Sequence, residues 1–200
     1  MPRVTRLLAA FGALCVLPAS VLLAGQPASA DPVFHLSFAH TDGTTHLAKP
    51  NVDVPISTFD LESDLDLGTG NLTATAQIPD LTATLNALGF LRVTAVTRLV
   101  PVGNLTGTLS GSTLTASSTF TIQILRLSPA GLPKVNLVPR GCRTARATTA
   151  TLTNTTPISL TDMTLSGSFT IPRFTGCGLL TGAVNLTLPG AGNALTLHLH

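Results

Sequence analysis

The sequence predicts an all-β protein, an antiparallel β-sandwich or barrel of about ten short strands with one disulfide. The clearest sign is the segment 58–67, Thr-Phe-Asp-Leu-Glu-Ser-Asp-Leu-Asp-Leu, in which acidic residues alternate strictly with the others. A period of two is typical of a strand with one face on a core and the other in water. Turn residues recur about every 8 to 12 residues, and later segments repeat the alternation with Thr, which favours strands, in place of the acids.

Residues 1–30 have the pattern of a signal peptide. Arg3 and Arg6 precede an apolar stretch over 7–23, and Ala-Ser-Ala at 28–30 is a small-x-small cleavage site. A transmembrane anchor is the alternative, but the apolar stretch is short, contains a proline and leads into a cleavage site. We therefore expect a single all-β domain of residues 31–200, secreted or associated with the cell envelope, with no transmembrane span after cleavage.

The charge balance argues against nucleic acid as a partner. Removing the two leader arginines leaves 11 − 2 = 9 basic residues against 9 acidic ones, so the exported chain has no basic excess. Aromatic residues make up only 4%, without Trp or Tyr, which counts against sugar binding by stacking. The charges are segregated, because every acid except Asp162 lies at or before Asp80 and every exported base except Lys49 lies from Arg92 onward. We interpret this as acidic and basic strands lying near each other.

In the first half of the exported chain the alternation predicts strands at 33–40, 58–67 and 72–78. Asp-Gly at 42–43 predicts a turn over 41–44, and two prolines bracket a short extended piece at 51–54. Matching the apolar faces places Leu67 opposite Leu72 and Leu65 opposite Ala74, across a four-residue loop. Segment 81–85 alternates again, with a short helix over 82–88 as the alternative.

The second half predicts further strands and no amphipathic helix. Strand 90–100 carries Arg92 and Arg98, which we expect to pair with the acidic row of the first half. The remaining expected extended segments are 120–124, 134–138, 144–153, 163–171, 179–188 and 195–200. The acidic row consists of Asp60, Glu62, Asp64 and Asp66. On segment 163–171, we expect the inward face to consist of Met163, Leu165, Phe169 and Ile171.

Cys142 and Cys177 are the cysteines that remain after export, since Cys15 lies in the leader. In an oxidising compartment we expect the two to form a disulfide. A redox-active or metal-binding pair is the alternative, but neither their spacing nor a neighbouring His supports it.

His198 and His200 are weak candidates for a metal site. On a strand they share a face, and His35, His40 or His46 could supply a third ligand. Two imidazoles do not make a site, and outward polar residues alternating with two leucines explain the pattern equally well. We therefore expect no metal and no cofactor.

Catalytic machinery is not evident in the sequence. No Gly-x-Ser-x-Gly elbow is present, and the acidic row, on one strand face, cannot flank a sugar from two sides or wrap around Ca²⁺. The sequence thus predicts no catalytic residue and a protein that is not an enzyme. Arg140, Arg143 and Arg146 surround Cys142 and could meet an anionic envelope polymer or a lipid headgroup, although ordinary loop solubility is the favoured interpretation.

The C-terminal third carries a resemblance. The segments 169–181 (Phe-Thr-Ile-Pro-Arg-Phe-Thr-Gly-Cys-Gly-Leu-Leu-Thr) and 185–193 (Asn-Leu-Thr-Leu-Pro-Gly-Ala-Gly-Asn) resemble a broad family of small exported proteins from high-GC Gram-positive bacteria, the actinobacteria. The similarity extends to 90–103 and to Cys142-Arg143. The chain departs from the family pattern at Gly141, where Asn is usual, and at Ala191, where Pro is usual. The resemblance implies export, the disulfide and an all-β fold, and it implies no activity.

Three functions remain open, in this order. The first is a non-enzymatic secreted or envelope-associated β-domain with a structural or adhesive role. The second is a carrier of an apolar, lipid-like ligand, because small inward residues leave room for a cavity. A hydrolase is a distant third. An elongated apolar cavity would favour the carrier, whereas a filled core would favour the structural role. The small inward residues are Ala74, Ala76, Ala83 and Ala95.

Overall fold

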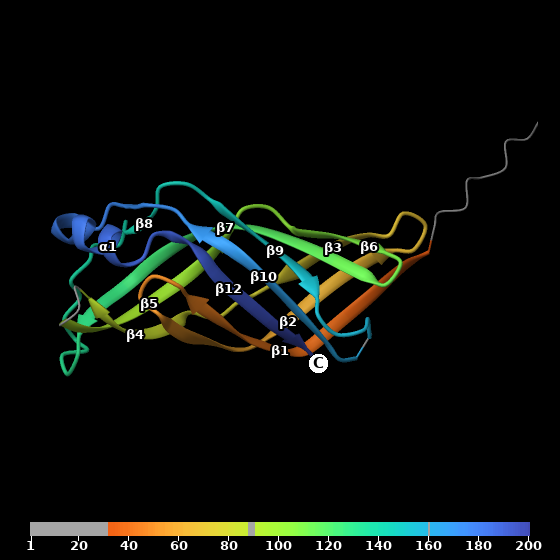
Figure 1. The fold of residues 1–200 in the computed structure, drawn as a ribbon, viewed down its shortest axis with the longest axis horizontal. Helices are drawn as coiled ribbons and strands as arrows, with labels where there is room; N and C mark the ends of the chain where they lie inside the picture. Colours follow the sequence, from red (N-terminus) through yellow and green to blue (C-terminus); the bar gives the residue numbers. More distant parts are fainter. Residues whose placement is uncertain (1–31, 88–90, 160) are drawn as a thin grey trace, which may run out of the picture. The chain divides into compact units, whose positions relative to one another are not determined.

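The computed structural model describes residues 32–87, 91–159 and 161–200, so the predicted leader lies outside the described residues. This part of the chain is built mostly of strands, with one short 3₁₀ turn and one short helix (Figure 1). The elements are β1 (Val33–Leu47), β2 (Val52–Asp66), β3 (Asn71–Ala76), β4 (Leu81–Ala87), β5 (Leu91–Pro101), β6 (Leu105–Ser110), β7 (Thr113–Pro129), β8 (Arg143–Thr144), β9 (Thr148–Asn154), β10 (Met163–Ile171), β11 (Phe174–Thr175), η1 (Gly178–Leu180), α1 (Thr181–Thr187) and β12 (Gly190–Leu199).

Eight of the strands close into an antiparallel barrel, in the order β7-β6-β3-β2-β1-β12-β10-β9, with β9 pairing back onto β7. The all-β prediction is confirmed, and of the two architectures left open the barrel is the one that forms. Closure gives every strand of the ring two neighbours, so no strand of the ring is left as a free edge strand over its whole length.

The remaining strands extend the barrel at one end. The first part of β7 pairs with β6 and β9, while its last ten residues, Phe120–Pro129, pair with β5. β4 pairs with the outer edge of β5, and β8 and β11 continue from the other side of β7. We call this the α1 end, because α1 packs there against β4 and β11.

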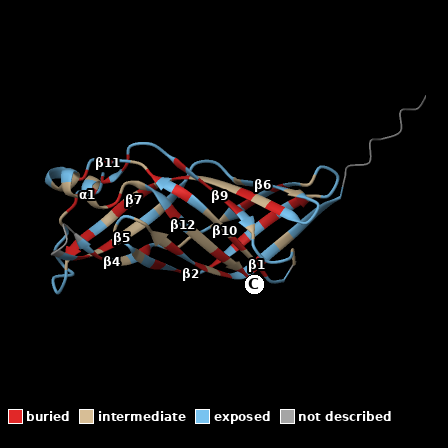
Figure 2. Cartoon of the chain, viewed as in Figure 1, coloured by how far each residue is buried: buried red, intermediate tan, exposed pale blue. Residues whose placement is uncertain are grey.

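Burial follows the alternation that the sequence shows. On β2, Phe59, Leu61 and Leu65 are buried while the acidic row faces outward, and Figure 2 shows the same alternation along the other strands. The inward side chains form two clusters, one at the α1 end around Ile124 and one around Phe38. Leu47, Val52, Ala83, Leu99 and Leu195 pack against both clusters, so a single interior runs through the barrel.

The predicted register of β2 and β3 is wrong by two residues. Leu65 lies opposite Leu72 and Ser63 opposite Ala74. The turn begins earlier because Asp66 organises it: its carboxylate accepts hydrogen bonds from the N–H groups of Gly68 (2.8 Å) and Thr69 (3.2 Å). A shift of two residues leaves every side chain on its predicted face, so face matching alone cannot detect it.

The predicted turn over 41–44 is also wrong, because β1 continues through it. Asp-Gly here marks an irregular stretch, with register shifts on both sides of Thr41. Gly43 lies against β12 so closely that an added Cβ would meet the carbonyl oxygen of Thr196. The glycine is therefore required by close strand approach rather than by a turn.

Two predicted extended segments differ in the structure. Residues 134–138 form a loop, and 179–188 form η1 and α1 instead of a strand. In α1, Val184 is buried and its carbonyl accepts a hydrogen bond from Leu188 N–H (3.0 Å). Asn185 holds the helix to β11, donating to the carbonyl of Phe174 (2.9 Å) and accepting from its N–H (2.7 Å). The described helices are too short to cross a membrane.

The predicted strand at 81–85 is confirmed as β4, which excludes the alternative helix over 82–88 for its described residues. The inward face of β10 is also as predicted, with all four of its named apolar side chains buried.

Candidate functional site: an apolar cavity with a side opening

The pairing of the strands leaves an opening in the barrel wall. β6 covers β3 only over Asn71–Ala74, so residues 75–78 have no strand on that edge within the described chain. β4 covers β5 only up to Thr97, so residues 98–101 are likewise unpaired on the edge away from β7. These two stretches and the connection 102–104 frame what we call the side opening.

A cavity of about 370 Å³ lies behind the side opening. This volume falls within the roughly 300–1,000 Å³ typical of small-molecule sites. Its walls are inward side chains from most strands of the barrel, and its rim carries the polar residues Thr75, Gln77, Arg98 and Asn104. The apolar walls comprise Phe59, Leu61, Ala74, Ala76, Leu99, Leu105, Phe120, Ala150, Leu152, Leu195 and Leu197.

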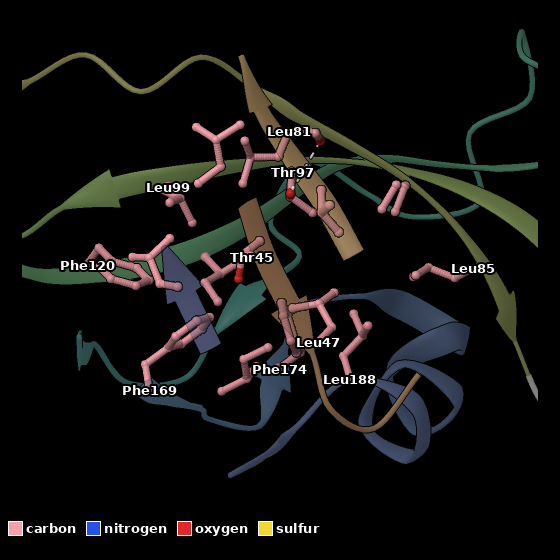
Figure 3. A pocket seen from close by; sticks show the side chains of 17 residues that line it. Thr45, Leu47, Leu81, Leu85, Thr97, Leu99, Phe120, Phe169, Phe174 and Leu188 are labelled. Carbon is pink, nitrogen blue, oxygen red and sulfur yellow. Dashed lines mark hydrogen bonds between the residues drawn. The ribbon is translucent and has the colours of Figure 1, made fainter. Parts of the chain in front are cut away.

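Two smaller apolar cavities flank it. One of about 90 Å³ shares Leu61, Ala74, Leu105, Leu152 and Leu197 with the large cavity. The other, of about 70 Å³, lies toward the α1 end and shares Leu99, Phe120 and Leu195 with it (Figure 3). Because each neighbour shares wall residues with the large one, the three cavities lie next to one another in the apolar interior.

Small inward residues create this space. Ala74 and Ala76 line the large cavity, and Ala83 and Ala95 line the smaller one shown in Figure 3, as their predicted inward positions imply. Ala150 has the same role but was not predicted. Its signal was available, since it follows the alternation of 148–154, in which Thr148, Ala150 and Leu152 are buried.

The polar groups on the walls of the cavity in Figure 3 are satisfied by the barrel itself. Figure 3 shows Thr45 and Thr97 among the leucine and phenylalanine side chains. The hydroxyl of Thr45 donates to the carbonyl of Ala194 (3.0 Å), and that of Thr97 donates to the carbonyl of Leu81 (3.4 Å). Their hydrogen-bonding capacity is thus used locally, and the cavity offers an apolar ligand an apolar surface.

An ion pair lies at the rim of the side opening. Arg98 contacts Asp80 through two nearly parallel hydrogen bonds, Nε to Oδ1 (2.7 Å) and Nη2 to Oδ2 (2.8 Å). The hydrogen bonds from Arg98 lower the pKa of Asp80 below its ordinary value, and Asp80 raises the pKa of Arg98. The pair therefore stays ionised at neutral pH and ties β5 to the chain that enters β4.

The acidic row is not paired with Arg92 and Arg98, contrary to the sequence-based expectation. β2 lies between β1 and β3, so the acids meet neighbours on β1 instead: Asp64 contacts His35, and Glu62 accepts a hydrogen bond from Ser37 (2.7 Å). Arg98 pairs with Asp80, an acid outside the row. The row forms a solvent-facing surface on β2.

Cys142 and Cys177 form the predicted disulfide, with their Cα atoms 4.2 Å apart. Both cysteines are fully buried in the cluster at the α1 end. The bond joins the loop after β7 to the residue that precedes η1. Its position indicates a structural bond that anchors the short helical segment.

His198 of β12 and His200, just beyond its end, stack with ring centroids 6.4 Å apart. His198 Nδ1 lies 3.1 Å from the hydroxyl of Thr164, and His200 Nδ1 lies 3.9 Å from Asp162. His35 and His46 contact other carboxylates, Asp64 and Asp53. The described residues bring together no group of three or more His, Cys, Asp or Glu side chains suited to a metal ion.

Comparisons of the chain with protein-family models, with curated proteins and with solved structures find no match. The resemblance to exported actinobacterial proteins therefore stays a prediction. Function must be inferred from the geometry of the barrel.

Proposed function

We propose that this protein is a non-catalytic, exported binder of an elongated apolar ligand, such as the acyl chain of a lipid, which enters through the side opening. The observation that carries the proposal is the row of three apolar cavities, the largest of about 370 Å³, inside a closed barrel. Eight-stranded barrels have interiors wide enough for one small ligand when their inward side chains are small.

The rim indicates how such a ligand would lie. The interior walls are aliphatic and aromatic, whereas Gln77, Arg98 and Asn104 gather at the opening. An amphiphile would place its chain inside and keep its polar head among these groups, since burying an unpaired polar head is costly. Apolar chains gain free energy roughly in proportion to the area they remove from water.

The structural or adhesive role receives less support from the same geometry. A purely structural barrel of this size is expected to fill its interior with side chains, because interiors pack densely and each void costs stability. Here the void is large, and a gap in strand pairing opens toward it. The leader pattern and the disulfide support export, with the cell exterior or envelope as the place of action.

Filling the cavity tests the proposal. Ala74→Leu adds three carbons at the wall shared by two cavities, so we expect it to weaken binding of cis-parinaric acid, a fluorescent long-chain fatty acid, by roughly tenfold or more. Fluorescence titration of the exported protein measures the change. Ala76→Leu, nearer the opening, provides a second blocking variant if Ala74→Leu disturbs the fold.

Thr73→Leu is the matched control, since Thr73 is exposed on the outer face of the same strand. It should leave the affinity for the probe unchanged. Equal affinities for wild type, both blocking variants and the control would show that the probe binds elsewhere. The cavity would then have no role in binding.

A further inference from the structure

The α1 end of the barrel is built mostly from segments that contain no carboxylate. Between Leu81 and His200 the sequence has a single acid, Asp162. Most strands and loops of the α1 end come from this stretch: the β4–β5 pair, the last part of β7 with its following loop, β8, β11, η1 and α1. The β1–β2 turn also lies there, since Leu47 and Val52 pack against the same cluster, and it adds one charge of each sign, Lys49 and Asp53. The charge segregation in the sequence thus becomes a charge difference between parts of the barrel.

Six cations of these acid-free segments are exposed at this end: Arg92, Arg126, Lys134, Arg140, Arg143 and Arg173. None of them forms an ion pair with a described residue. Arg126 donates only a long hydrogen bond, to the carbonyl of Pro133 (3.4 Å). The α1 end therefore presents uncompensated positive charge.

Large apolar side chains project from the same end. Leu179 of η1 is fully exposed and Leu186 of α1 is 67% exposed, while Leu132 and Val135 protrude from the loop that follows β7. This exposure does not come from a loose segment, because Val184 and the disulfide anchor the helical turn to the core. Clustered exposed apolar residues in a monomer mark an interaction surface.

We propose that the α1 end docks onto a membrane surface rich in anionic lipid. The cations lie where headgroup phosphates attract them, and Leu179 and Leu186 are placed to enter the boundary between headgroups and acyl chains. An anionic polymer would satisfy the cations but would leave the leucines in water. Both features together fit a lipid surface.

The interior reaches toward this surface. A further apolar cavity of about 80 Å³ lies beneath α1 and shares Leu85 and Leu188 with the cavity of Figure 3. Docking through the α1 end would bring this part of the interior next to lipid. The docking inference itself does not require an occupied cavity, because its residues lie outside the large cavity and the side opening.

Co-sedimentation of the exported protein with vesicles tests the inference. We expect binding to phosphatidylglycerol-containing vesicles, weak binding to pure phosphatidylcholine vesicles, and loss of binding as salt screens the charges. The triple reversal Lys134→Glu, Arg140→Glu, Arg173→Glu and the double variant Leu179→Gln, Leu186→Gln should each lower vesicle affinity by roughly tenfold or more. Circular dichroism confirms that each variant keeps its fold.

Leu67→Gln, in the β2–β3 turn, is the matched control outside the α1 end. It should bind vesicles as the wild type does. Equal binding to both vesicle types, equal loss in the control, or binding to soluble polyphosphate without binding to vesicles would overturn the inference. Ala74→Leu should leave vesicle binding intact, so failure of the cavity proposal can be told apart from failure of docking.

Discussion

Hydroxyl side chains explain how a barrel with so few charged residues remains ordered on both faces. On the outside they pair across strands, as Thr119 does with Thr149 at 2.9 Å and Ser166 with Thr196 at 3.2 Å. On the inside they bond to backbone carbonyls, as Thr148 does with Thr170 at 2.6 Å. Thr can serve both faces because its methyl group packs while its hydroxyl is satisfied locally.

Thr41 departs from this rule. It is fully buried at the irregular stretch of β1, and its hydroxyl has no hydrogen-bond partner among the described residues. Burying an unsatisfied hydroxyl is unfavourable, so Thr41→Val should raise the free energy of unfolding by about 1 kcal/mol. Chemical denaturation of the two proteins measures the difference.

Thr45→Val is the control for this substitution. Thr45 lies on the same strand and is also buried, but its hydroxyl is bonded to the carbonyl of Ala194. This variant should lose about 1 kcal/mol, because it leaves that carbonyl without its partner. A loss of stability in Thr41→Val as large as in Thr45→Val would mean that the Thr41 hydroxyl is satisfied in solution.

At the level of elements, β7 connects the closed ring of eight strands to the α1 end. Its first part belongs to the closed ring, and its second part carries β5 and β8 at the α1 end. Because β6 and β5 follow one another along the same edge of β7, a gap remains between them and β3. That gap is the side opening, so the access to the cavity results from strand order.

The disulfide anchors η1 and α1 to the rest of the α1 end. It closes a loop with a sequence separation of 35 residues, for which the chain-entropy model gives about 4 kcal/mol. We expect the double variant Cys142→Ala, Cys177→Ala to lower the free energy of unfolding by about that amount, measured by denaturation. An unchanged stability would show that packing around Val184 alone holds the helical segment.

The period of two predicted which residues face inward far better than where elements begin and end. It identified β2, β4 and β10 and the inward alanines of the cavity, since alternation reports directly on the face that a side chain occupies. It could not determine the register of β2 against β3, because a shift of two residues leaves every side chain on the same face. It also predicted a strand over 179–188 where η1 and α1 form. There Val184 and Leu188 are buried one helical turn apart, while Leu179 and Leu186 point to solvent.

The side opening lay beyond sequence reasoning for a different reason. It depends on which strands pair, and the separations between paired strands, such as β1 with β12, span most of the chain. Local patterns carry no information on that order. The predicted contact between the acidic row and the arginines of β5 is wrong for the same reason: β1 and β3 lie on the two sides of β2, so β5 is not its neighbour.

For the molecule as a whole, the apolar interior and the charge segregation are two separate properties of one barrel. The interior provides space for a chain-like ligand, and the α1 end provides cations and exposed leucines for a lipid surface. Neither property depends on a catalytic group. They support two separate proposals, an apolar ligand in the interior and a lipid surface at the α1 end.

Native mass spectrometry of the protein purified from the medium of its own host tests the central claim most directly. We expect the spectrum to show the chain with one bound apolar molecule, which collisional activation releases and organic extraction recovers as a lipid. Ala74→Leu, prepared in the same way, should carry much less of it. A wild-type protein that is entirely ligand-free, and that also fails to take up a long-chain fatty acid, would contradict the claim.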